Sequence, residues 1–239
     1  MSHPLSYFQA LYVINLPSRA DRRRDMDRQL AALGLGLDHP AVRLFPAIRP
    51  GAPAGFPSIG ARGCFLSHLT VLREARERRL PRLAILEDDL NFAPDCGQRL
   101  PALVDSLAAA DWTVFYGGHR IDEPLGEPAP GGLLAIPSQT AVHTTHFIAL
   151  NGPVAIAACV AHLEAILARR PGDPRGGPMH VDGAYTWFRR AHPDAATLLA
   201  VPELGYQRSS RTDVHDLRWF DRLPVAREAV AWLRQWRNA

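Results

Sequence analysis

In the stretch LAILEDD at residues 83–89, four apolar residues lead directly into three consecutive carboxylates. A short apolar run that is bounded by turn signals is typical of a buried strand. In open α/β sheets, ligands bind in the crevice outside the carboxyl ends of the strands. Glu87, Asp88 and Asp89 are therefore the strongest candidates for a functional site.

Apolar strands and amphipathic helices alternate on both sides of this stretch. This alternation predicts an α/β fold, with a Rossmann-type, mostly parallel sheet flanked by helices. A capping box formed by Ser18 and Asp21 predicts the start of the first helix. Glycine and proline make residues 117–132 a predicted surface loop. The expected strands cover residues 11–16, 41–46, 83–86, 112–116, 142–150 and 197–201, and later helices cover about 65–75, 96–109, 154–169, 180–190 and 225–237.

The composition restricts the function classes. All 27 basic residues are arginine, which excludes mechanisms that depend on a P-loop or Schiff-base lysine. A formal net charge of +3, without a basic stripe, argues against nucleic acid as a partner. The cysteines Cys64, Cys96 and Cys159 form no CxxC pair, so we expect buried free thiols rather than disulfides or a cysteine zinc site.

The chain shows no internal repeat, no linker that would divide it, no secretory signal and no membrane-spanning segment. We therefore expect a single domain over residues 1–239 in the cytoplasm.

The acidic cluster suits a divalent cation. Side chains alternate along an extended chain, so we expect Glu87 and Asp89 to point one way and Asp88 the other. Two carboxylates on one side repel each other unless a positive charge lies between them. Oxygen ligands of this kind favour Mg²⁺ or Mn²⁺. The alternative is a solvated acidic turn that caps the following helix.

Several segments together resemble the family 25 glycosyltransferases, which include lipooligosaccharide sugar transferases and collagen galactosyltransferases. The resemblance covers about residues 10–216, and the second and third segments at their spacing are its most specific part. The segments are VINLPSRADRR at 13–23, GCFLSHLTVLREA at 63–75, LAILEDDL at 83–90, HVDGAY at 180–185 and GYQRSSRTDVHD at 205–216.

This resemblance implies a GT-A-like fold, a nucleotide-sugar donor (often UDP-galactose), an acidic metal motif and inversion at the anomeric carbon. It implies transfer to a glycan, a lipid-linked glycan or another hydroxyl acceptor, as in lipopolysaccharide or lipooligosaccharide biosynthesis. Two other classes remain open. One is a metal-dependent phosphohydrolase or nucleotidyltransferase, and the other is a non-catalytic protein that binds nucleotide sugars.

The resemblance also suggests chemical roles for the acidic residues. Glu87 and Asp89 become the main ligands of Mn²⁺ or Mg²⁺, which neutralises the leaving diphosphate. Asp88 supports them or contacts the donor, and His215 is a candidate third ligand. Asp182 is the candidate catalytic base, and an N-cap for the following helix is its alternative.

Further residues are assigned to the nucleotide sugar. Asn15, Arg19 and Arg22 follow the first strand, where amide and guanidinium groups bind base or phosphate. Ser67 and His68 lie near a helix start, and capping or a core role is the alternative for His68. Residue Gln207 is expected to close over the phosphates, with a solvated loop as its alternative.

The last predicted helix, at about 225–237, is amphipathic and carries tryptophan and arginine. Packing against its own domain is one interpretation. Peripheral association with the inner face of the membrane is the other, and it would suit a lipid-linked acceptor.

Overall fold

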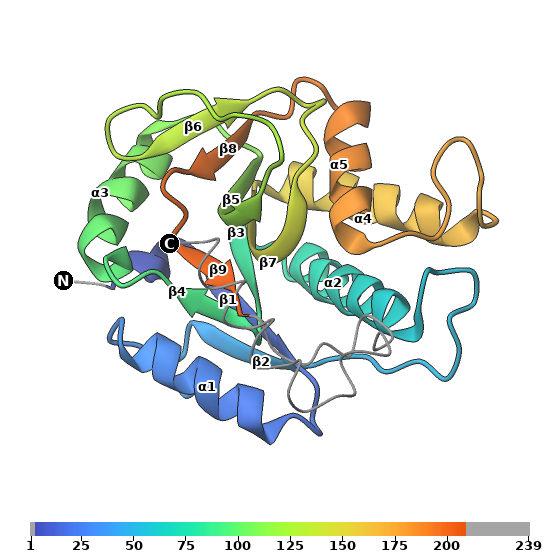
Figure 1. The fold of residues 1–239 in the computed structure, drawn as a ribbon, viewed down its shortest axis with the longest axis horizontal. Helices are drawn as coiled ribbons and strands as arrows, with labels where there is room; N and C mark the ends of the chain where they lie inside the picture. Colours follow the sequence, from blue (N-terminus) through green and yellow to red (C-terminus); the bar gives the residue numbers. More distant parts are fainter. Residues whose placement is uncertain (1–2, 209–239) are drawn as a thin grey trace, which may run out of the picture.

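The computed structural model describes residues 3–208, drawn in colour in Figure 1. A short 3-10 helix, η1 (Pro4–Tyr7), precedes the first strand. The α-helices are α1 (Ala20–Ala31), α2 (Ile59–Glu77), α3 (Cys96–Ala109), α4 (Pro153–Ala168) and α5 (Val181–Ala191). The strands are β1 (Ala10–Asn15), β2 (Val42–Pro46), β3 (Arg82–Glu87), β4 (Leu90–Phe92), β5 (Val114–Arg120), β6 (Leu133–Ile136), β7 (His143–Asn151), β8 (Thr197–Ala200) and β9 (Gly205–Gln207).

Seven strands form the main sheet in the order β2-β1-β3-β7-β5-β8-β6. The pairs β1–β2, β1–β3 and β5–β8 are parallel, whereas β7 is antiparallel to both β3 and β5, and β6 is antiparallel to β8. Five of the seven strands therefore run in one direction. The predicted α/β fold with a mostly parallel sheet flanked by helices is confirmed.

The sheet separates two hydrophobic layers, because successive side chains of a strand point to opposite faces. Tyr12 and Ile14 of β1 face the core beneath α2, α4 and α5. Leu11 and Val13 face the core beneath η1, α1 and α3. Figure 1 shows these two helical layers on either side of the strands. Both faces are thus covered, and polar side chains are left to gather at the strand ends.

A second, two-stranded sheet joins β4 to β9 in antiparallel register, with Asn91 opposite Tyr206. Gly205 permits this close approach, because a Cβ atom there would lie 2.6 Å from the Asn91 carbonyl oxygen. The pairing carries Gln207 and Arg208 back to the turn that follows β3. A late segment of the described chain therefore borders the acidic cluster.

Most predicted elements correspond to observed ones, but three local predictions need correction. Ser18 and Asp21 form no capping box, because the N-cap of α1 is Arg19 and Asp21 pairs with the Arg19 guanidinium. The expected loop at 117–132 is partly strand, since β5 continues to Arg120. The short strands β4, β6 and β9 were not predicted. The expected helix at 225–237 lies outside the described residues. Among the helices of residues 3–208, none has the length and hydropathy of a membrane span.

Candidate active site

The site is built where the carboxyl ends of two parallel strands meet the beginning of an antiparallel one. Ile14 pairs with Glu87 across β1 and β3, so Asn15 and Asp88 follow at the same edge. Because β7 runs antiparallel to β3, with Leu86 opposite Phe147, its first residues lie beside the end of β3. Thr145 reaches the acidic cluster in this way. Residues 83–89 thus form both an inner strand of the sheet and the acidic cluster of the site.

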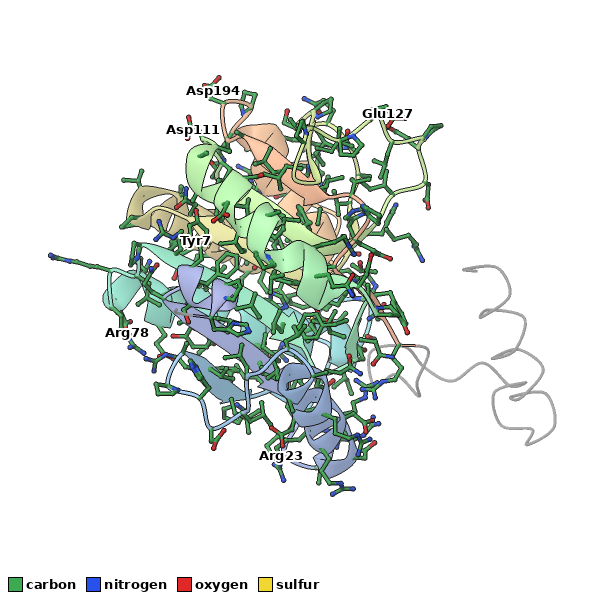
Figure 2. All side chains as sticks on the ribbon, turned by 90° about the vertical axis from the view of Figure 1, so that its left-hand side faces the viewer. Tyr7, Arg23, Arg78, Asp111, Glu127 and Asp194 are labelled. Atoms are coloured by element: carbon green, nitrogen blue, oxygen red, sulfur yellow. The ribbon has the colours of Figure 1, made fainter. Side chains whose placement is uncertain are left out.

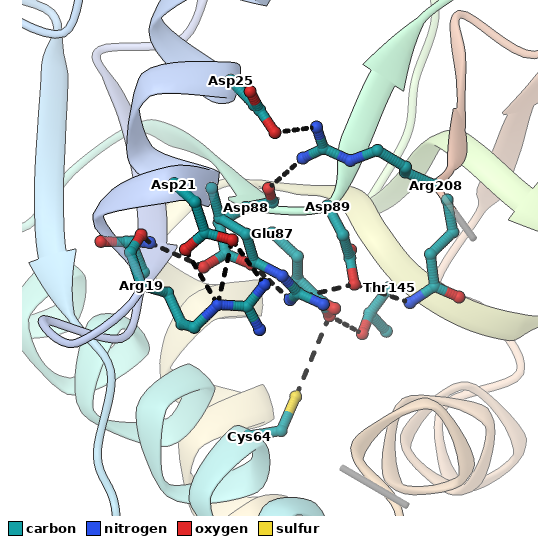
Figure 3. A network of polar contacts seen from close by, with 12 residues as sticks. Arg19, Asp21, Asp25, Cys64, Glu87, Asp88, Asp89, Thr145 and Arg208 are labelled. Carbon is teal, nitrogen blue, oxygen red and sulfur yellow. Dashed lines mark hydrogen bonds and ion pairs between the residues drawn. The ribbon is translucent and has the colours of Figure 1, made fainter. Parts of the chain in front are cut away.

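Asp88 is held by two buried donors. Asn15 donates its side-chain amide to Asp88 Oδ2 at 2.7 Å, and Arg22 donates Nη1 to Asp88 Oδ1 at 2.8 Å. Figure 3 shows this network from close by. Arg23, which is next in the sequence, lies on the outer side of α1 (Figure 2). Of this arginine-rich helix, Arg22 is the residue that reaches the acidic cluster.

Arg22 also reaches Asp89, whose Oδ2 lies 3.4 Å from the same Nη1 nitrogen. The expected alternation, with Glu87 and Asp89 on one side and Asp88 on the other, is therefore wrong. Residues 88 and 89 form a turn rather than extended strand, and this turn brings both aspartates to one guanidinium. A positive charge does lie between two carboxylates, and in this structure Arg22 supplies it.

Within the described part of the chain, Asp89 has few hydrogen-bond donors for its two carboxylate oxygens. Burial and the charge of Glu87 raise its pKa to about 7, although Arg22 acts in the opposite direction. Its Oδ1 oxygen is buried without a hydrogen-bond partner, and Oδ2 accepts a long bond of 3.4 Å from Gln207. A buried carboxylate oxygen in this state is suited to bind a cation. Gln207 therefore lies beside Asp89, and its contact with donor phosphates stays a prediction.

Glu87 turns toward α2 rather than toward Arg22. Thr145 donates its hydroxyl to Glu87 Oε1 at 2.6 Å, and His68 Nε2 lies 3.3 Å from the same oxygen. Burial alone would raise the pKa of Glu87, but the contacts with His68 and Thr145 more than offset it, so the pKa is lowered. Glu87 is therefore charged at neutral pH. It faces a different set of partners from the two aspartates.

Cys64 completes the surroundings of Glu87 and was not predicted as a site residue. Cys64 and His68 lie four residues apart on α2, so they share one face of the helix. Cys64 Sγ is 3.9 Å from Glu87 Oε1, and His68 Nδ1 is 3.1 Å from the Tyr185 hydroxyl. The i, i+4 spacing of a cysteine and a histidine was the signal in the sequence that could have found this group.

Asp182 lies in the first turn of α5, whose N-cap is His180, so the N-cap alternative for Asp182 is wrong. Its Oδ2 accepts the backbone N–H of Thr144 at 3.3 Å, and Oδ1 accepts that of Gly183 at 2.7 Å. Thr144 has a φ of +74°, which is strained for a β-branched residue. Strained backbone is common at functional sites. In this conformation the backbone N–H of Thr144 points at the Asp182 carboxylate.

The remaining predicted residues are placed as follows. The hydroxyl of Ser67 donates to the Gly63 carbonyl and accepts the N–H of Ile48, which ties the segment after β2 to α2. Arg19 pairs with Asp21 beside the Asp88 network. The proposed nucleotide contacts of these residues stay predictions. His215 lies outside the described residues.

The contacts of Arg208 with the acidic cluster were not predicted. Arg208 donates its backbone N–H to the Asp89 carbonyl at 2.7 Å and Nη2 to the Asp88 carbonyl at 3.0 Å. Its Nη1 also pairs with Asp25 of α1. Arg208 therefore ties β9 to α1 across the turn, and it fixes the backbone from which both aspartates project.

The site residues fit a divalent cation, as judged by the chemistry of their donors. The free Oδ1 of Asp89 and the charged carboxylate of Glu87 are oxygen ligands that lie in one acidic environment. Asp88 already accepts hydrogen bonds from Asn15 and Arg22, and its role as a support of the cation site or as a donor contact stays a prediction. In the described chain, Cys64, His68 and Glu87 also offer three ligand atoms within 4.8 Å of one another.

Known proteins resemble this chain in the segment that carries the site. Residues 57–121 match the family model described as glycosyltransferase family 25 (LPS biosynthesis protein). This range includes α2, β3 and the acidic turn. Among solved structures, a glycosyltransferase involved in the glycosylation of the major capsid of PBCV-1 aligns with a TM-score of 0.48 at 11% identity, over 85% of this chain and 93% of that one.

Curated relatives match about half of the chain. Procollagen galactosyltransferase 1-B of Xenopus laevis is 32% identical, over 52% of this chain and 24% of that protein. Procollagen galactosyltransferase 2 of Homo sapiens is 30% identical, over 47% of this chain and 21% of that protein. The inactive glycosyltransferase 25 family member 3 of Homo sapiens is 31% identical, over 53% and 24%.

The aligned part spans about a quarter of the length of these relatives, which include both galactosyltransferases and an inactive member. The family match falls on the helix and strand that bring Cys64, His68 and Glu87 together, and on the turn with Asp88 and Asp89. This chain is therefore similar to the family 25 glycosyltransferases in the segment that carries the site, and the resemblance indicated by its sequence motifs is confirmed.

Proposed function

We propose that this chain transfers a sugar from a nucleotide-sugar donor to a hydroxyl group of a glycan or similar acceptor, with inversion at the anomeric carbon. The observation that carries the proposal is the acidic cluster Glu87–Asp88–Asp89, which lies inside the family match and pairs with Arg22, while Asp182 and these three carboxylates all act on Cys64. A UDP-sugar, with galactose as the first candidate, is the proposed donor. The acceptor class extends to lipopolysaccharide and lipooligosaccharide precursors.

Asp182 is the proposed base. It takes the proton from the acceptor hydroxyl while that oxygen forms a bond to the anomeric carbon, and the bond from this carbon to the nucleoside diphosphate breaks. The backbone N–H groups of Thr144 and Gly183 hold the carboxylate in place and leave lone pairs on both oxygens. Positioning of this kind lowers the barrier by fixing the reacting atoms.

The donor is proposed to lie along the turn between β3 and β4. Arg22 pairs with both Asp88 and Asp89, and Asn15 orients Asp88 from β1. Gln207 of β9 donates a hydrogen bond to Asp89, so it borders the proposed position of the donor. A bound Mn²⁺ or Mg²⁺ with Asp89 and Glu87 as ligands would neutralise the charge that develops on the leaving diphosphate.

Two alternatives use the same residues. A phosphohydrolase would cleave the nucleotide sugar without an acceptor, and a non-catalytic protein would bind it unchanged. The second deserves a direct test because an inactive family member is among the relatives. A cytoplasmic location, and contact of residues 225–237 with the inner face of the membrane, are proposals that accompany the lipopolysaccharide assignment.

The experiment is a product analysis with UDP-galactose and related donors, a divalent cation and a panel of acceptors. Wild type is compared with Asp182→Asn, and Asp105→Asn on the exposed face of α3 serves as the matched control. Transfer that requires both Asp182 and an acceptor supports the proposal. Release of UDP at the same rate without acceptor would instead identify a hydrolase, and binding without turnover would identify the non-catalytic alternative.

A further inference from the structure

Glu87 has two neighbours on α2 that a site for Mg²⁺ or Mn²⁺ would not require. Cys64 Sγ lies 3.9 Å from Glu87 Oε1, and His68 Nε2 lies 3.3 Å from the same oxygen. One ligand atom from each of the three residues lies within 4.8 Å of the others. Sulfur, nitrogen and oxygen donors therefore converge on one point beside the acidic turn.

From this convergence we propose that Cys64, His68 and Glu87 bind a thiophilic divalent cation of the Zn²⁺ type. The proposal concerns binding alone and does not depend on the proposed function. A thiolate and an imidazole favour Zn²⁺ over Mg²⁺ or Mn²⁺, which prefer oxygen. Three protein ligands leave one tetrahedral position for water or for an oxygen of a substrate.

Two of the three ligand separations can be compared directly with those around such an ion, and all three are within 4.8 Å. For tetrahedral zinc, with bonds of about 2.0–2.1 Å to nitrogen and oxygen and about 2.3 Å to sulfur, ligand atoms lie roughly 3.3–3.6 Å apart. The separation of 3.3 Å between His68 and Glu87 falls in this range. The 3.9 Å between Cys64 and Glu87 requires a movement of a few tenths of an ångström, which one side-chain torsion provides.

Each ligand also has support from a second residue or from its helix. The Tyr185 hydroxyl lies 3.1 Å from His68 Nδ1, so its oxygen can accept the Nδ1 hydrogen and leave the Nε2 lone pair for the cation. Thr145 donates to Glu87 Oε1 at 2.6 Å and occupies one of its two lone pairs. Helix α2 fixes Cys64 and His68 one turn apart.

The charges around Cys64 favour a cation as well. The carboxylates of Glu87, Asp89, Asp182 and Asp88 all act electrostatically on this thiol. The same carboxylates attract a divalent ion. When the ion binds, the thiol proton leaves to solvent and a sulfur–metal bond forms, so binding releases one proton from Cys64.

Cobalt provides the most specific test, because a Co²⁺–thiolate bond gives a charge-transfer absorption band that oxygen ligands do not give. The tag-free full chain is stripped with a chelator and titrated with Co²⁺ and then with Zn²⁺. We expect one equivalent of Co²⁺ to produce the band and Zn²⁺ to displace it. The Cys64→Ser variant should lose the band, and Cys159→Ser, which alters a buried thiol in the core, should keep it.

Affinity and thiol protection give two further readouts. Tyr185→Phe removes the support of His68 and should weaken Zn²⁺ binding about 10-fold or more. In the wild type, saturating Zn²⁺ should protect Cys64 from alkylation, as mapped by mass spectrometry. This measurement needs no variant, so it stands even if Cys64→Ser fails to fold.

The proposal is overturned if wild type shows no thiolate band, if the band persists in Cys64→Ser, or if Zn²⁺ leaves the alkylation of Cys64 unchanged. Binding of Mn²⁺ alone, with equal affinity in wild type and Cys64→Ser, would assign the cation to the carboxylates and also overturn it. A chain that binds Zn²⁺ at Cys64 but transfers no sugar would support this site and contradict the proposed function.

Discussion

The Arg22 guanidinium lies 2.8 Å from the Asp88 carboxylate, and each side chain is only 9% exposed. The same guanidinium also lies 3.4 Å from Asp89. One cation from α1 thus serves two carboxylates that follow β3, although 66 residues separate Arg22 from Asp88 in the sequence. This bridge joins the first helix to the acidic turn.

Removal of the bridge should destabilise the protein strongly. In the Arg22→Gln variant, two buried carboxylates lose their shared cation, and breaking a buried pair costs about 3–5 kcal/mol. Urea unfolding measures the loss. Arg23→Gln, on the outer side of the same helix, should change the free energy of unfolding by no more than about 0.5 kcal/mol. Equal effects of the two substitutions would contradict the role given to Arg22.

Asp89 should make stability depend on pH. Its pKa rises from 3.8 to about 7 on folding, so between these values the folded chain binds more protons than the unfolded chain. Stability therefore falls as pH rises from about 4 to about 7, and it levels off above. With a chelator present, Asp89→Asn should remove this dependence and be more stable at pH 8, by about 4 kcal/mol at most.

The control for that experiment is Asp105→Asn, which alters an exposed carboxylate on α3. Unfolding curves for the wild type and both variants are compared from pH 4 to pH 8. A constant difference between wild type and Asp89→Asn over this range would show that Asp89 does not titrate as described.

The pairing of β4 with β9 should depend on Gly205. In Gly205→Ala the new methyl group would meet the Asn91 carbonyl oxygen and the Leu90 side chain, at 2.6 Å and 2.7 Å. We expect a loss of about 1–3 kcal/mol from overpacking, together with weaker donor binding because Gln207 is displaced. Gly51→Ala is the control, since no atom lies within 4 Å of its added Cβ. Thermal unfolding measures the loss of stability, and nucleotide-sugar titration measures the change in donor affinity.

Asp182 should act in the chemical step rather than in donor binding. Loss of a general base typically lowers kcat about 10²–10⁴-fold. We therefore expect Asp182→Asn to lose turnover on this scale while its Kd for the donor stays within about threefold of wild type. A Kd that rises in proportion to the loss of kcat would assign Asp182 to donor binding instead.

The sequence was most informative where local patterns and tertiary structure agree. The apolar run before Glu87 predicted β3, and the carboxyl-edge rule predicted a site at the end of that strand, where Asn15 of β1 contacts Asp88. Helix α3 was predicted with its observed limits, because its apolar residues follow a clear helical period. These features depend on neighbours that lie close in the sequence or on a general property of parallel sheets.

The partners of the acidic residues could not be predicted in the same way. Strands β4 and β9 have three residues each and form only through their mutual pairing, so the contact of Gln207 with Asp89 depends on long-range register. The alternation rule failed because Asp88 and Asp89 lie in a turn, where the rule for extended chain does not hold. Cys64 was assigned to the core, since the sequence does not show that its helix faces Glu87.

Calorimetric titration of nucleotide sugars, with and without a divalent cation, tests whether this chain binds a donor at the acidic cluster. Wild type, Asp89→Asn and Asp105→Asn are compared, with UDP-galactose as the first ligand. The proposed donor site requires tight binding of one donor that depends on both the cation and Asp89 and is unchanged in Asp105→Asn. The absence of binding by any nucleotide sugar in wild type, under every cation condition, would contradict it.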